Sequence, residues 1–188
     1  MKILALMAMA AVLGGQTLEK VRNDRVVAAE VSLAAGESES ARPGLRVWLE
    51  PGSVDGAAVQ RGEVRFGGGI RNTGKTPIRY VRVEFPGGGS GETWGATGLA
   101  PHYKLLMENR YTRVYDIRIP AHTDEPQHTH HDRVVICLSG AKLEHLYPDG
   151  RREPSTLATG EVVWRRGGTH IGQNLGDTDL WVIAVEPK

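Results

Sequence analysis

The most informative stretch of the sequence is residues 126–132, Pro126-Gln127-His128-Thr129-His130-His131-Asp132, which precedes the apolar run 133–138. Side chains two positions apart on a β-strand point to the same face, so His128 and His130 should lie side by side at the start of a buried strand. A third histidine, His170, follows a glycine-rich turn about forty residues later. Neutral imidazoles from two strands commonly hold a divalent transition metal, so the sequence predicts a metal site at His128, His130 and His170.

The composition favours many short strands. The chain has 188 residues, with 24 glycines and 10 prolines between short β-branched runs, and no segment is long and periodic enough to predict a helix. Lysine and arginine number 23 and aspartate and glutamate 22, so the net charge is +1 without a basic block. Neither nucleic acid nor an acidic membrane surface is therefore an expected partner, whereas a small-molecule ligand is.

The N-terminus has the pattern of a secretory signal peptide. Lys2 precedes an apolar run from Ile3 to Leu13, and the small pair Gly14-Gly15 follows. This run is about half of the roughly 20 residues that a membrane-spanning helix needs, so we expect residues 1–15 to be a cleaved signal, with no membrane span in the mature chain. An exported protein, periplasmic or extracellular, is the expected product. The alternative is a buried N-terminal strand or helix.

The chain contains an internal duplication. The matching pairs of segments are 25–36 with 112–122, 62–66 with 160–164, and 72–84 with 174–186. All seven histidines lie at or beyond His102, and Arg42 and Gly44 stand opposite His128 and His130 in this alignment, so the first copy should be a packing partner without a metal site. We expect a degenerate copy at 16–86, a Gly-rich linker at 87–102 and a metal-binding copy at 103–188.

These residues resemble the two motifs of the cupin superfamily. The first family motif runs Gly, five residues, His-x-His, three or four residues, Glu, then Gly. Here it is represented by His128, His130 and Gly140, with His122 where the leading Gly would stand. The second motif, which runs from Gly to His and Asn, is represented in this sequence by Gly160, Gly167, His170 and Asn174, with Arg165 in place of a Pro.

The resemblance covers residues 103–187 well and 25–85 weakly. It implies an all-β fold of two jelly-roll barrels, each a double-stranded β-helix, in a bicupin arrangement similar to small bacterial cupins of the type-2 conserved-barrel kind. Cupins often dimerise through barrel edges, so the resemblance also allows a homodimer.

The resemblance also implies the ligand set. The glutamate ligand of the family would fall at Val134 or Val135, so the expected ligands are three histidines. Thiol, diketone and gentisate dioxygenases of the cupin type hold Fe(II) in this way. We therefore expect one divalent metal ion, with Fe(II) favoured and Mn, Zn or Ni as alternatives, and with open positions for a substrate anion and O₂.

Other residues are candidates for supporting roles. His122 and Asp132 share the strand parity of the histidine pair, and these two and Asn174 are possible additional ligands or partners of the ligands, although a side-chain bond from Asn174 to the backbone is favoured. The candidates for substrate contact are Tyr115, Trp164 and Arg165, of which Arg165 suits a carboxylate. Core packing is the alternative for the two aromatic residues.

The inward face of the following strand is expected to be apolar. Val134, Ile136 and Leu138 should point into the barrel behind the metal site and exclude water from it. His145 should lie on the surface. The single cysteine, Cys137, cannot pair within the chain and should be a buried, inert thiol.

Two functions fit this pattern. The leading interpretation is an exported, metal-dependent enzyme of the cupin type that acts on a small organic acid, most simply an oxygenase but also an isomerase or a lyase. The alternative is a non-catalytic metal-binding or small-ligand-binding protein of the cell envelope. The absence of the family glutamate and of a clear general base other than Asp132 favours the alternative.

Overall fold

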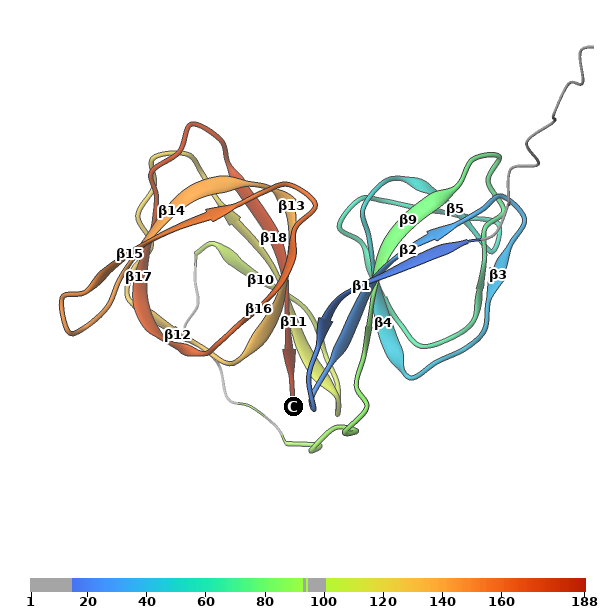
Figure 1. Ribbon diagram of the computed structural model, residues 1–188, viewed down its shortest axis with the longest axis horizontal. Helices are drawn as coiled ribbons and strands as arrows, with labels where there is room; N and C mark the ends of the chain where they lie inside the picture. Colours follow the sequence, from blue (N-terminus) through green and yellow to red (C-terminus); the bar gives the residue numbers. More distant parts are fainter. Residues whose placement is uncertain (1–14, 93, 95–100) are drawn as a thin grey trace, which may run out of the picture.

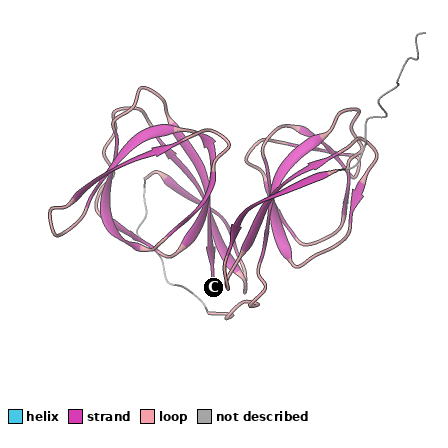
Figure 2. Ribbon diagram, viewed as in Figure 1, coloured by secondary structure: helices cyan, strands magenta, loops and turns pink. Residues whose placement is uncertain are grey.

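The computed structural model describes residues 15–92, 94 and 101–188. Over these residues the protein consists of β-strands and turns without a helix, as Figure 2 shows, so the predicted all-β class is confirmed. No helix in this part of the chain has the length and hydropathy of a membrane span. Residues 1–14 of the expected signal peptide, and 93 and 95–100 of the expected linker, lie outside the described residues.

The strands form two barrels that lie side by side (Figure 1). The strands of the first barrel are β1 (Gln16–Arg22), β2 (Val27–Leu33), β3 (Ser38–Glu39), β4 (Gly44–Trp48), β5 (Gly52–Val54), β6 (Ala57–Val59), β7 (Val64–Phe66), β8 (Ile70–Arg71) and β9 (Ile78–Glu84). The strands of the second barrel are β10 (Tyr103–Glu108), β11 (Thr112–Ile119), β12 (His128–His130), β13 (Arg133–Ser139), β14 (Ala141–Leu146), β15 (Arg152–Leu157), β16 (Val162–Arg165), β17 (Gly168–Asn174) and β18 (Leu180–Pro187).

The two barrels share one topology. The largest sheet of the first has the strand order β1-β2-β9-β4-β7, and that of the second has the order β10-β11-β18-β13-β16. The hydrogen-bond register is also repeated, since Leu33 pairs with Ile78 as Ile119 pairs with Leu180. The first strand pair of each barrel even has an irregularity at the same place, after Glu19 and after Leu105. The sequence duplication is therefore also a duplication of strand pairing.

An apolar core joins the barrels. It contains Leu45 and Val47 from β4 together with Val134 and Ile136 from β13, all of them fully buried. Leu45 faces Val83 on β9 as Val134 faces Val185 on β18, so the barrels pack through equivalent faces. Because β13 and β18 are covered on both sides, by their own barrel interior and by the other barrel, their central parts read as continuous apolar runs.

This packing overturns one expectation about β13. Val134, Ile136 and Leu138 do not line the barrel behind the histidines, because they belong to the core between the barrels. Val135 and Cys137 point into the second barrel instead. The strand is interrupted at His131 and Asp132, between β12 and β13, so the alternation of β12 does not continue into β13. Cys137 is buried as expected, and burial raises the pKa of its thiol to about 11.

Candidate metal centre

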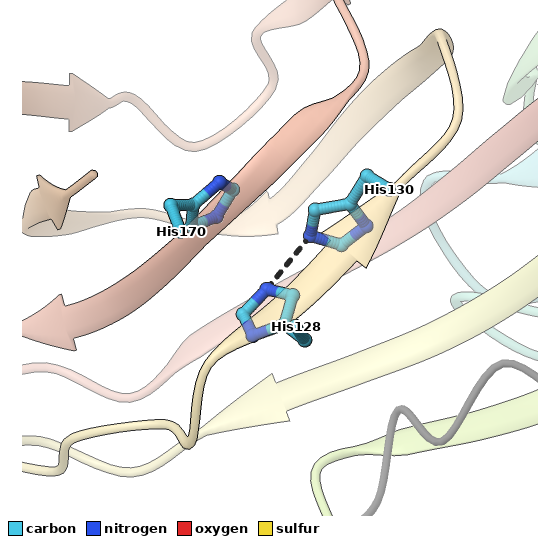
Figure 3. A group of neighbouring side chains, drawn as sticks. All are labelled: His128, His130 and His170. Carbon is cyan, nitrogen blue, oxygen red and sulfur yellow. Dashed lines mark hydrogen bonds between the residues drawn. The ribbon is translucent and has the colours of Figure 1, made fainter. Parts of the chain in front are cut away.

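The three predicted histidines come together on two paired strands. His128 on β12 is the direct cross-strand partner of His170 on β17, and His130 lies two residues further along β12. Figure 3 shows the three imidazoles pointing toward one another. Their side chains are buried, with exposed fractions of 7%, 6% and 8% for His128, His130 and His170. One ring nitrogen from each lies within 4.8 Å of the others.

The nitrogen geometry fits a metal ion. The Nε2 atoms of His128 and His130 are 3.0 Å apart. Two nitrogens that each lie about 2.1 Å from one ion, at right angles to each other, are separated by about 3 Å. The Nδ1 atom of His128 lies 2.8 Å from the carbonyl of Pro126, to which it donates when it carries the proton. That hydrogen bond leaves the Nε2 lone pair free to face the centre.

The surroundings keep the imidazoles neutral. Burial lowers the pKa of His128, and it lowers that of His170 to about 3. The pKa of His130 is well below its ordinary value of 6.5, because of burial and then because of the positive charge of Arg133. Neutral imidazole is the form that coordinates a metal, so burial prepares the ligands at neutral pH.

Tyr103 completes the centre from the edge strand β10. Its hydroxyl lies 3.2 Å from Nε2 of His128 and 3.3 Å from Nε2 of His130. Burial raises the pKa of this phenol well above 10, so it remains protonated. The sequence did not single out Tyr103, because β10 reaches the histidines only through tertiary structure and the spacing carries no signal.

His145 also belongs to the centre, so its expected surface position is wrong. Its ring lies 4.6 Å from that of His170, and burial lowers its pKa. β14 pairs with β17 so that His145 stands opposite Gly172. The alternation of inward Leu143 with His145 could have revealed this, since residues two apart share a face.

Two connected hollows lie against the histidines. The inner one is a cavity of about 60 Å³, whose polar lining includes Tyr103, Glu125, His130, Arg133 and Arg165. The outer one is a basin of about 340 Å³. The residues that line both are Arg133, His145, Ser155, Arg165 and His170. A molecule that enters the basin can therefore reach the imidazoles past two guanidinium groups.

No protein-family model matches the sequence, and no curated protein sequence matches it. Solved structures do resemble the chain. A cupin 2 conserved barrel domain protein from Leptotrichia buccalis is 12% identical, with 97% of this chain and 93% of that chain covered and a TM-score of 0.61. AerE from Microcystis aeruginosa is 13% identical, with 93% of each chain covered and a TM-score of 0.63.

A third similar structure is a mutant of the salicylate 1,2-dioxygenase from Pseudoaminobacter salicylatoxidans in complex with gentisate. It is 11% identical, with 96% of this chain and 76% of that chain covered and a TM-score of 0.61. The chain has the fold of the cupin superfamily. At these identities the similarity establishes the fold, and within that cupin fold the histidines occupy paired strands of the second barrel.

The cupin barrel does not bring the possible additional ligands into the histidine group. His122 is exposed in a turn with a backbone φ of 55°, and its ring lies 3.1 Å from Asp177. Asp132 accepts a hydrogen bond of 2.6 Å from the backbone N–H of Gly167 and lies 3.4 Å from Arg25 of the first barrel. Asp132 therefore links the barrels, because the break before β13 turns it away from the parity expected for it.

Asn174 stabilises the backbone of the cupin barrel. Its side-chain amide donates to the carbonyls of Ile119, Pro120 and Thr178, and its oxygen accepts from the backbone N–H of Gly176. Asn72 makes the matching bonds in the first barrel, to Leu33, Thr76 and Gly74. The favoured interpretation of Asn174 as a backbone-bonding residue agrees with these contacts.

The substrate-contact candidates lie at different depths. Arg165 lines both the cavity and the basin. Trp164 lines the basin and packs against the core between the barrels. Tyr115 lies in the apolar core of the second barrel, with its ring 6.2 Å from that of Tyr103.

The histidines of the second barrel lie on segments that are longer than their counterparts in the first barrel. The backbone N–H of Asn72 donates to the carbonyl of Glu37, and that of Asn174 donates to the carbonyl of Thr123. Glu37 and Thr123 are therefore equivalent, and so are Glu39 and Glu125, which lie two residues further along. Six positions lead from Glu39 to Leu45, whereas nine lead from Glu125 to the equivalent Val134.

The segment before the asparagine is longer as well. Eight positions lead from Val64 to Asn72, and twelve lead from the equivalent Val162 to Asn174. The expected pairing of Gly44 with His130 is therefore wrong, since Gly44 is equivalent to Arg133. The histidine-bearing strand pair of β12 and β17 is therefore an extension that the first barrel lacks.

Proposed function

We propose that the second barrel binds one divalent transition metal through His128, His130 and His170 and acts as a metal-dependent, oxygenase-like enzyme on a small carboxylic acid. The observation that supports this best is the buried, neutral histidine group that opens onto a cavity with two guanidinium groups. Three neutral ligands leave the charge of a divalent ion uncompensated, which suits an anionic substrate. When bound, the metal would supply a positive centre that polarises the substrate and O₂.

The arginines support an acidic substrate. Arg133 is buried beside His130, and its hydrogen bond to the carbonyl of His131 is long, at 3.4 Å. Arg165 makes a hydrogen bond of 3.5 Å to Ser155. Within the described part of the chain, neither guanidinium forms a salt bridge. Arg133 is buried, so a substrate carboxylate would supply an ion-pair partner for its guanidinium.

The remaining side chains define what the site can do with such a substrate. The hydroxyl of Tyr103 stands beside the Nε2 atoms of His128 and His130, where it can donate a hydrogen bond to a group held at the centre. Ile117, Val135 and Leu143 form apolar walls that exclude water and strengthen the electrostatic interactions inside. The salicylate 1,2-dioxygenase with a similar fold was crystallised with gentisate, an aromatic acid, which agrees with this assignment.

The test is the metal content of the protein, purified without chelator or affinity nickel, together with its activity. We expect about one metal ion per chain in the wild type and none in a His128→Ala/His130→Ala double variant. His131→Ala is the matched control, because His131 is exposed, stacks on Trp94 and should leave the metal in place.

O₂ consumption by the iron-loaded protein with a panel of carboxylic acids tests the reaction. Turnover that disappears in the double variant supports an oxygenase. Metal binding without turnover across the panel would contradict the oxygenase assignment and leave a metal-binding protein. No metal in the wild type, even after reconstitution, would overturn the metal site itself.

A further inference from the structure

The inner cavity contains a buried carboxyl group, one oxygen of which has no hydrogen-bond partner among the described residues. Glu125 follows β11, and its backbone N–H donates to the carbonyl of Gly172 at 2.8 Å, which holds it beside β17. The residue is 5% exposed and lines the cavity. Its Oε1 atom is buried and has no hydrogen-bond partner among the described residues. Buried carboxyl oxygens are normally hydrogen-bonded, so this oxygen needs a partner that a bound molecule can supply.

The first barrel shows what occupies this position in the duplicate copy. Glu39, the equivalent of Glu125, forms an ion pair of 2.7 Å with Arg46 and a second ion pair with Arg82. Arg46 is only 2% exposed, so this carboxylate and its guanidinium lie inside the barrel. In the first barrel, a carboxylate at this position therefore binds two guanidinium groups.

The second barrel has neither of these arginines. Arg46 pairs with Arg82 across β4 and β9, and at the equivalent positions Val135 pairs with Ala184 across β13 and β18. Val135 lines the cavity, so a short apolar side chain stands where the first barrel has the guanidinium of Arg46. The second barrel thus has the carboxyl at this position without the two arginines that pair with its counterpart.

We infer that the ligand of the second barrel carries a nitrogen cation, an ammonium or guanidinium group, that binds Glu125, in addition to the carboxylate that binds Arg133 and Arg165. The ligand class is thus an amino acid or a guanidino acid. This inference rests on the proposed function for the identity of the site and narrows its substrate class. The cationic end would occupy the inner cavity, and the carboxylate would lie toward the basin.

The charges around Glu125 are consistent with this assignment. Burial raises the pKa of Glu125 to about 7, while Tyr103 and Arg133 act in the opposite direction, by a hydrogen bond and by charge. Arg133 is not within salt-bridge distance of Glu125 in the described structure, and it also faces the outer basin. A ligand cation beside Glu125 would favour the ionised carboxylate, as Arg46 and Arg82 do for Glu39, whose pKa is lowered.

The experiment compares three probes that share one carboxylate and differ at the other end. They are 4-guanidinobutanoate, 4-aminobutanoate and butanoate, titrated calorimetrically into the full-length, metal-loaded protein. We expect at least one of the two cationic probes to bind about tenfold or more tightly than butanoate, and we expect this preference to disappear in Glu125→Gln. Glu153→Gln is the control, since Glu153 lines the basin but pairs with Arg151.

The outcomes are distinguishable from those of the metal test. Equal affinity for the three probes, no binding of any probe, or a preference that persists in Glu125→Gln would overturn the inference, whatever the metal content. Metal analysis of the same samples tests the proposed function separately. A cation preference that depends on Glu125 in a protein without metal would support the inference while the metal-dependent function failed.

Discussion

Replacing Glu125 by glutamine should change how the stability of the metal-free protein depends on pH. Burial raises the pKa of this carboxyl from its ordinary value of 4.5 to about 7. A carboxyl whose pKa is raised by folding favours the folded state while it is protonated, and this contribution is lost as the pH rises through the folded pKa. One pKa unit corresponds to about 1.4 kcal/mol, so the wild type should lose about 2.5 kcal/mol between pH 5 and pH 8 from this residue.

The assay is urea denaturation of the wild type and Glu125→Gln at several pH values between 5 and 8, after removal of metal. The histidines titrate in both proteins, so their effect cancels in the difference between the two free energies of unfolding. Between pH 5 and pH 8, the free energy of unfolding of the variant should rise by about 2.5 kcal/mol relative to that of the wild type. For Glu153→Gln, which removes an exposed carboxylate of the basin, the plot of unfolding free energy against pH should run parallel to that of the wild type. A parallel curve for Glu125→Gln would refute the argument from burial.

Two further predictions concern the arginine and the asparagine. Arg165→Ala should raise the KM for a carboxylic acid substrate roughly tenfold to hundredfold, because it removes a charge-assisted hydrogen bond. The control is Arg152→Ala, which removes an exposed arginine paired with Glu144 and should leave the KM unchanged. Equal KM values for Arg165→Ala and the wild type in steady-state kinetics would count against the carboxylate contact. Asn174→Ala should lower the free energy of unfolding by about 2–4 kcal/mol, since three backbone carbonyls lose their hydrogen-bond donor. Asn72→Ala, which removes two such bonds, should lower it somewhat less. Unchanged denaturation midpoints would contradict the role assigned to these amides.

The predictions that succeeded rest on local rules. The spacing of His128 and His130 puts two side chains on one face of any strand, and their partner His170 follows a turn that returns the chain alongside. Asn72 and Asn174 stand at the same place in two copies of one pattern, and the structure gives them the same bonds. Short apolar runs between glycines and prolines are sufficient to predict strands.

The predictions that failed depended on continuity between strands. Asp132 and Val134 were assigned an inward direction by extending the alternation of β12, but the chain breaks at His131 and Asp132 before β13 begins. The alternation within β13 could not correct this, because Val134 and Val135 are both apolar. Each of them is buried, one against the other barrel and one inside its own.

Glu125 and His145 were missed for a different reason. Glu125 stands among charged turn residues in the sequence, and only the cross-strand contact with Gly172 places it inside the barrel. His145 lies among tyrosine and charged residues, and the pairing of β14 with β17 brings it to His170. The contact of Glu125 leaves no local pattern, whereas the alternation of Leu143 and His145 along β14 does indicate the inward face.

The sequence by itself determined that the protein is all-β, that its two halves repeat one unit, and that three histidines of the second half share a site, because strand alternation and turn chemistry act over a few residues. Only the tertiary structure decided which face of β13 is the barrel interior and which groups line the cavity. A strand buried on both faces carries no alternation to read. A buried carboxyl oxygen without a hydrogen-bond partner, such as Oε1 of Glu125, can be identified only from the neighbours that the fold assigns to it.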